Sequence, residues 1–233
     1  MKKIVYIWGI VALLVSCTPK KQQLLILCTN DSHSQVEPKD GNKGGFAARA
    51  NLVDSLRKIY PLNLLLDAGD IMQGTPYFNL YHGRIEIAAY NRLGYDAITL
   101  GNHEFDYGLD TLAMFLRLAS FPIVSCNYKV DGTPLEGLVK PYAIFERGGL
   151  KVAVVGFGVS PESLILKSNF DPVEYLDPIE RGNYYADSLR NAGVDYIIAL
   201  SHLGYFTDGR ANDSTLAAKS KNIDIILGGH THR

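Results

Sequence analysis

Five short, largely apolar runs recur along this chain, and polar side chains follow each of them directly. The runs are Leu24–Leu27, Leu62–Leu66, Ala97–Leu100, Tyr196–Leu200 and Ile223–Leu227. Short apolar runs bounded by polar and glycine residues are typical of buried strands. In an open α/β sheet the ligand crevice lies at the carboxyl ends of the strands. We therefore expect the polar residues that follow these runs to lie close together.

Helical periodicity alternates with these runs. Apolar residues three and four positions apart predict helices, which we place at Gly45–Tyr60, Ile85–Leu93, Leu109–Leu118, Pro178–Ala192 and Thr215–Lys219. Further strands are predicted at Ile123–Val124 and in a hairpin, Tyr142–Phe145 with Lys151–Val155, around Gly148 and Gly149. The segment around Gly74 and Pro76 is predicted as a loop. No linker divides the chain, so we expect one layered α/β domain.

The N-terminus has the features of a targeting segment. Lys2 and Lys3 precede the apolar stretch Ile4–Val15, which is too short for the roughly 20 helical residues that cross a bilayer. Leu14–Cys17 resembles the processing box of bacterial lipoproteins. That resemblance implies a signal peptide at residues 1–16, lipid on Cys17 and a tether at 17–23, leaving 24–233 as the folded domain. The protein would then lie in the bacterial cell envelope, anchored to a membrane outside the cytoplasm. The alternative is an ordinary cleaved signal with a cysteine there by chance.

Composition and charge limit the classes of partner. The net charge is −1, and Lys and Arg are scattered, which gives little attraction for a nucleic-acid backbone. We therefore expect no nucleic-acid partner. Beyond Cys17 the chain has only Cys28 and Cys126, which we interpret as buried free thiols rather than a disulfide.

Five of the six histidines lie in the polar motifs at the predicted strand ends. The motifs are Asn30–His33, Gly69–Asp70, Gly101–Glu104, Ser201–His202 and Gly228–His232. The side chains of residues two apart on an extended chain point the same way. Asp31 with His33, and His230 with His232, could therefore each hold one ion. Asp70 could bridge two cations. Mixed oxygen and nitrogen ligands suit zinc, manganese or iron better than calcium. Taken singly, each motif could instead be a turn or a helix cap, and His82 is expected in an exposed loop.

In this order, the motifs resemble those of the calcineurin-like metallophosphoesterase superfamily. The strings Asn30–His33, Gly101–Asp106 and Ser201–Gly204 are similar to its 5′-nucleotidase branch, which also contains UDP-sugar hydrolases and 2′,3′-cyclic nucleotide phosphodiesterases. The resemblance covers Leu24 to His232. It implies a layered αββα sandwich in residues 24–233 with a dimetal site at the carboxyl ends of the strands.

The resemblance also implies roles for individual residues. One divalent ion would be held by Asp31, His33, Asp70 and His232, and the other by Asp70, Asn102, His202 and His230. His103, oriented by Asp106, would not be a ligand but would stabilise the phosphate or protonate the leaving oxygen. Two cations about 4 Å apart can lower the pKa of a shared water towards about 7 and supply hydroxide for attack. A neighbouring imidazole contributes roughly 10²–10⁴ in rate as a proton donor.

Two hypotheses for the function remain open. The first is a membrane-tethered dinuclear phosphohydrolase that releases phosphate from nucleotides, or from UDP-sugars or cyclic nucleotides. The second is a catalytically incomplete subunit that binds metal or nucleotide. In 5′-nucleotidases a C-terminal domain binds much of the nucleoside, and further strands complete the sandwich. Because this sequence ends at Arg233, we expect a fragment, or a separate chain that supplies the substrate domain.

Overall fold

The computed structural model describes residues 23–39, 41 and 43–232. The predicted signal peptide, Cys17 and nearly all of the predicted tether lie outside the described residues. Among the residues that are described, no helix is both long enough and apolar enough to cross a membrane.

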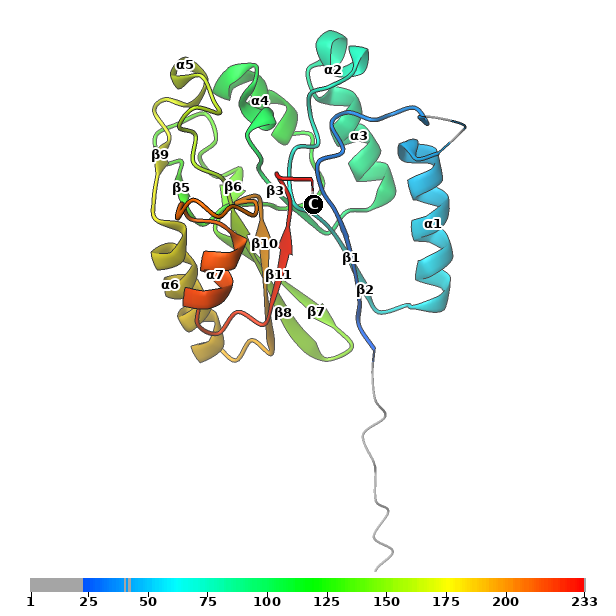
Figure 1. Ribbon diagram of the computed structural model, residues 1–233. Helices are drawn as coiled ribbons and strands as arrows, with labels where there is room; N and C mark the ends of the chain where they lie inside the picture. The colour runs from blue at the N-terminus through cyan, green and yellow to red at the C-terminus, as the bar shows by residue number, and fades with distance from the viewer. Residues whose placement is uncertain (1–22, 40, 42, 233) are drawn as a thin grey trace, which may run out of the picture.

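Two sheets packed face to face form the centre of the molecule (Figure 1). The first sheet is parallel, in the order β1 (Leu25–Thr29), β2 (Asn63–Asp67), β3 (Ala97–Thr99), β4 (Ile123–Val124) and β6 (Val139–Lys140). The second has the order β11 (Ile225–Gly228), β10 (Tyr196–Ser201), β8 (Leu150–Phe157) and β7 (Tyr142–Arg147). In it only β7 runs antiparallel to its neighbour. β5 (Tyr128–Lys129) and β9 (Glu174–Tyr175) form a separate antiparallel pair.

Helices cover the outer faces of both sheets. The helices are α1 (Gly45–Ile59), α2 (Pro76–Tyr81), α3 (Arg84–Leu93), α4 (Gly108–Leu116), α5 (Lys167–Phe170), α6 (Pro178–Asn191) and α7 (Asp213–Lys219), with a 3₁₀ turn η1 at His103–Phe105. Helices α1, α3 and α4 pack into one core with the first sheet, and α6 and α7 into another with the second. The predicted αββα order of layers is confirmed.

Alternation along the strands creates these layers. In β8, Val152 and Val154 face the other sheet, whereas Ala153 and Val155 face the helices. In β2, Leu64 and Leu66 face the other sheet and Leu65 faces the helices. Both faces are therefore buried, which is why the sequence shows continuous apolar runs rather than alternating ones. Full burial of each such side chain contributes about 1.5–3 kcal/mol.

Polar caps fix where the last two helices begin. The Asp177 carboxylate accepts hydrogen bonds from the backbone N–H groups of Ile179 and Glu180, and proline occupies the first turn of α6. Asn212 and Thr215 form a capping box at α7. Each cap contributes about 1 kcal/mol. These caps explain why α7 begins at Asp213, two residues earlier than the apolar periodicity predicts.

The predicted helices and strands all occur, with ends shifted by up to two residues. The segment around Pro76 was predicted as a loop, and this is wrong: Pro76–Tyr81 is α2, with its proline at the first helical position. The two-residue strands β5, β6 and β9 were not predicted, because only pairing with distant strands defines them. Cys28 and Cys126 are free thiols, as predicted, although Cys28 is only partly buried.

The two sheets lie very close together where β8 passes the end of β4. Gly156 lies in β8, and a Cβ atom there would lie 2.0 Å from the Val124 carbonyl oxygen and 2.8 Å from the Ser125 nitrogen. Both of these are backbone atoms, which a change of rotamer cannot move aside. Only glycine therefore fits at this crossing.

We predict that Gly156→Ala lowers the free energy of unfolding by about 1–3 kcal/mol or more, because overpacking against backbone forces the sheets apart. Urea unfolding followed by circular dichroism would measure the change. Ser188→Ala, on the exposed face of α6, should change it by less than about 0.5 kcal/mol. An unchanged midpoint for Gly156→Ala would contradict the close approach of the sheets.

Candidate metal centre

The loops that follow β1, β2, β3, β10 and β11 meet at one edge of the sandwich. Both oxygens of the Asp31 carboxylate, after β1, accept the His230 backbone N–H at 3.0 and 2.9 Å, which ties the first strand to the last. A Cβ atom on Gly229 would lie 3.1 Å from the Ala68 carbonyl oxygen, so the β11 loop also contacts the β2 loop. Two sheets rather than one contribute the five strand ends (Figure 1).

The backbone turns sharply at the proposed ligands. Left-handed φ values between 45° and 75° occur at Asp31, His33, Asp70, His230 and His232. The expected extended alternation at both motifs is therefore wrong. Asp31 and His33 still lie in the same group, whereas His230 and His232 lie in different ones. Non-glycine residues rarely adopt this conformation, which recurs at functional sites that hold it in place.

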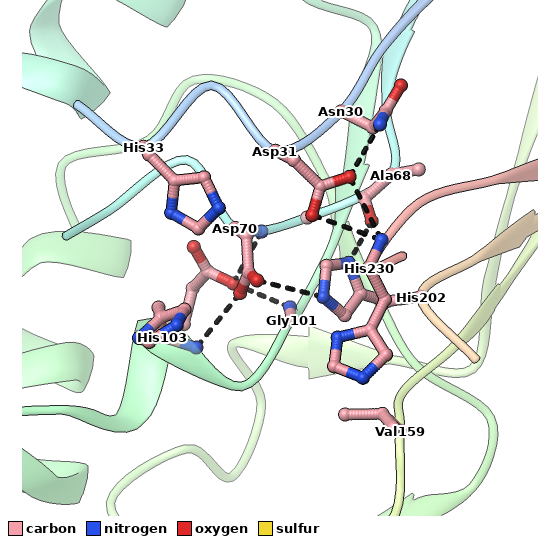
Figure 2. A network of polar contacts seen from close by, with 12 residues as sticks. Asn30, Asp31, His33, Ala68, Asp70, Gly101, His103, Val159, His202 and His230 are labelled. Atoms are coloured by element: carbon pink, nitrogen blue, oxygen red, sulfur yellow. Dashed lines mark hydrogen bonds and ion pairs between the residues drawn. The ribbon is translucent and has the colours of Figure 1, made fainter. Parts of the chain in front are cut away.

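Among the described residues, three groups of side chains could each hold a metal ion. In each group the ligand atoms lie within 4.8 Å of one another, and the groups are Asp31 with His33 and His232, His33 with Asp70 and His103, and Asp70 with His202 and His230. Asp70 belongs to two of them and lies between His33, His103 and His202 in Figure 2. The Nε2 atoms of His33 and His232 are 3.1 Å apart. This arrangement matches a pair of cations that share Asp70.

Several buried polar atoms of the proposed ligands have no hydrogen-bond partner in the part of the chain that the structure describes, as expected of atoms that bind a metal ion. Nδ1 of His33, Oδ1 of Asn102 and Nε2 of His202 are buried and have no hydrogen-bond partner. The Ala68 carbonyl accepts a hydrogen bond from Nδ1 of His202 (2.6 Å), so Nδ1 carries a proton and Nε2 is the ring nitrogen that could bind a metal ion. That Nε2 atom lies 3.1 Å from an Asp70 oxygen, without the angles of a hydrogen bond. Unpaired buried acceptors are costly, and a divalent cation would satisfy them.

The electrostatics of the site favour a cation. Burial opposes ionisation of Asp70, but the adjacent His202 outweighs it and lowers the pKa of the Asp70 carboxyl. Burial likewise opposes protonation of His202, yet Asp70 raises the pKa of its imidazole. Burial lowers the pKa values of His33 and His230 and so favours the neutral imidazole that binds metals.

His103 and Asp106 form a dyad beside these groups. Nδ1 of His103 lies 3.0 Å from the Asp106 carboxylate, and this hydrogen bond raises the pKa of the imidazole. The side chain of Asn169, in α5, donates to the Asp106 carbonyl oxygen at 2.8 Å. The second ring nitrogen of His103 is therefore free to act towards the cavity. His103 also belongs to one of the potential metal groups. Its role as a proton donor rather than a ligand therefore stays a prediction.

An open cavity of about 450 Å³ lies over the groups. Its lining residues are His33, Asp70, Gln73, Asn102, His103, Leu164, His230 and His232. A second cavity of about 470 Å³ shares His33 and His232 with the first and is lined by Asp31 as well. The structure thus brings together all the predicted ligands, although Asp31 and His202 do not line the first cavity.

Sequence reasoning missed two contributions to this site and misplaced one histidine. Glu104 was part of a motif but had no assigned role; it is 2% exposed, and burial with the Asp70 carboxylate nearby raises its pKa to about 7. The Ala68 carbonyl that orients His202 carries no sequence signal, because every residue has one. His82 ends α2, half-buried with its ring centroid 4.2 Å from that of Tyr107, rather than lying in an exposed loop.

Known proteins resemble this chain along most of its length. It is 40% identical to the snake venom 5′-nucleotidase of Gloydius brevicauda, covering 90% of this chain and 37% of that protein. The 5′-nucleotidase of Rattus norvegicus is 38% identical, over 92% of this chain and 39% of that protein. The crystal structure of the 5′-nucleotidase precursor from Thermus thermophilus superposes with a TM-score of 0.80 at 38% identity, over 90% and 42% of the two chains.

The matched region contains every proposed metal ligand. The chain spans about two fifths of the length of these relatives. The family model described as Calcineurin-like phosphoesterase matches residues 24–233. With its αββα layers and its shared carboxylate at the strand ends, the chain therefore belongs to the calcineurin-like phosphoesterase family.

Proposed function

We propose that the protein is a metal-dependent phosphohydrolase that releases phosphate from nucleotides. One observation carries the proposal: Asp70 joins two potential metal groups, and the His103–Asp106 dyad borders the same cavity. A protein that only stores metal has no need of a positioned proton donor. The 5′-nucleotidase relatives support nucleotides as the substrate class. UDP-sugars and cyclic nucleotides are the alternatives within that class.

The ligand set supports two divalent ions, which we propose to be zinc, manganese or iron. Asp31, His33, Asp70 and His232 would hold one ion, and Asp70, Asn102, His202 and His230 the other. When bound, such a pair supplies Lewis-acid activation of the phosphoryl group and of the attacking water. The buried Asp70 carboxylate would offset part of the repulsion between the two charges.

His103 would act on the leaving group. A departing alkoxide is a poor leaving group without a proton, and an imidazolium at the edge of the cavity can supply one. Asp106 binds Nδ1 and stabilises the protonated form, and it leaves Nε2 to face the substrate. Asn169 fixes the backbone of Asp106 and thereby the orientation of the dyad.

We further propose that the protein is anchored in the bacterial cell envelope by lipid on Cys17. The basic residues Lys2 and Lys3, the apolar stretch Ile4–Val15 and the processing box at Leu14–Cys17 support this location. Extracellular nucleotides would then be the accessible substrates. This part of the proposal rests on the sequence alone.

The metal content of variants distinguishes the proposed ligands from the proposed proton donor. Asp70→Asn should lose most of its metal, because it removes half a charge from each of two sites, whereas His103→Ala should retain both ions. Elemental analysis of the purified variants after dialysis would measure the stoichiometry. Equal loss of metal in both variants would make His103 a ligand and contradict the division of roles.

Turnover tests the proposed activity. We predict that the chain from Thr18 releases inorganic phosphate from AMP with added manganese, and that a chelator abolishes the release. His103→Ala should lower kcat by roughly 10²–10⁴ at unchanged metal content. His82→Ala is the matched control, since His82 lies outside the metal groups, and it should keep normal turnover. Full metal occupancy without turnover of any phosphate ester would instead support a binding subunit.

The anchor can be tested separately. Cys17→Ser removes the sulfur that would carry the lipid, so the protein should move from the membrane fraction to the soluble fraction of a bacterial host. Cys28→Ser is the control and should leave the distribution unchanged. Membrane association that persists in Cys17→Ser would contradict lipidation at this residue.

A further inference from the structure

Glu104 combines deep burial with an unusual set of partners. Its side chain lies in the η1 turn, and the residue is 2% exposed. Its carboxylate accepts backbone N–H groups from two separate loops: Oε1 from Ile71 (2.9 Å) and Met72 (3.3 Å), and Oε2 from Asp70 (3.0 Å) and Gly101 (2.5 Å). Within residues 43–232 no Lys, Arg or His forms an ion pair with it. Backbone amides are therefore its partners.

These amides belong to the segments that present two proposed ligands. Asp70, Ile71 and Met72 are consecutive residues of the loop after β2, and their N–H groups converge on one carboxylate. Gly101 opens the loop after β3, directly before Asn102. A cluster of successive N–H groups forms a concave anion site. Here the anion is a side chain of the protein, so the contact fixes the two loops relative to one another.

A second contact runs in the opposite direction between the same segments. The His103 N–H donates to Oδ1 of Asp70 at 2.9 Å, while Glu104 accepts the Asp70 N–H. A Cβ atom on Gly101 would lie 2.1 Å from the same Oδ1 atom. The reciprocal bonds and the close approach leave Asp70 little freedom, and they hold its backbone at a left-handed φ of 54°.

We propose that Glu104 is a positioning residue for the metal centre. Glu104 belongs to none of the potential metal groups among the described residues. It fixes the backbone of Asp70 and of the Asn102 turn, and so sets the separation between ligands that come from different strands. This inference rests on the proposed metal centre. Asp67 is a weaker candidate for the same role. Its carboxylate accepts only one backbone N–H group of this loop, that of Gly69.

Glu104→Gln is the sharpest test, because glutamine keeps the shape and removes one acceptor. Its single oxygen can accept two of the four N–H groups, and its NH₂ group would point at the other two. We expect binding of Mn²⁺ by the metal-stripped protein to weaken by about 10–100-fold, as for other residues that orient ligands. Isothermal titration calorimetry would measure the affinity. In the Co²⁺-loaded protein the visible absorption spectrum should also shift.

Asp96→Asn is the matched control. Asp96 also accepts a backbone N–H from β2, that of Leu65 (2.8 Å), and pairs with Arg147 at 2.6 Å. It directly precedes β3, however, and so lies at the end of that strand away from Gly101 and Asn102. Its loss should lower thermal stability and leave both the Mn²⁺ affinity and the Co²⁺ spectrum unchanged. If Glu104→Gln and Asp96→Asn weaken Mn²⁺ binding equally, general destabilisation explains the weaker binding. That result would overturn the inference.

The remaining outcomes separate this inference from the proposed function. The wild type could bind Mn²⁺ while Glu104→Gln shows the same Mn²⁺ affinity and the same Co²⁺ spectrum. That result would overturn the positioning role of Glu104 and leave the metal centre intact. If the wild type binds no ion, the metal centre fails and the inference fails with it. If Glu104→Gln does not fold, hydrogen exchange in the wild type decides. The amides of Asp70, Ile71 and Met72 should exchange slowly although they lie in a loop, and rapid exchange would contradict the role.

Discussion

The buried carboxylate of Asp70 is the interaction on which the site depends. It lies at the junction of the two sheets, where the His103 N–H and the His202 ring approach its two oxygens from different sheets. A negative charge with so little solvent around it requires nearby positive charge. Donors and imidazoles surround it, and the unpaired buried atoms of Asn102 and His202 are suited to a divalent cation. The arrangement of the ligands follows from the need to balance this one charge.

The sandwich makes that junction possible. The facing sides of the two sheets are apolar, and they pack closely enough that only glycine fits at position 156. Strands that run parallel within each sheet end at the same edge, and five loops therefore meet there. Because the strands are held by a buried apolar core, the loops can adopt left-handed turns that would be unstable in a flexible segment.

The site combines rigid and accessible parts. Asp70, Glu104 and His202 are almost fully buried, whereas His33, His103 and His230 are half-buried at the cavity. Buried groups fix geometry, and half-buried groups can reach an incoming phosphate ester. This division is expected of a centre that must hold ions permanently and exchange substrate. The segment matched by the family model contains all of these residues.

The sequence alone determined the α/β class, nearly all of the long elements and the list of candidate ligands, because apolar periodicity and short polar motifs are local signals. The αββα order of layers came from the family resemblance. The spacing of the motifs did not determine how the ligands combine; that division came only from the family resemblance. The i, i+2 spacing of His230 and His232 suggested a single ion, whereas the family resemblance assigned them to different ions; left-handed turns do place them in different groups. The contacts of Glu104 and the Ala68 carbonyl were equally invisible, since they join loops that are far apart in the chain. Such contacts depend on the packing of two sheets, which only the tertiary structure decided.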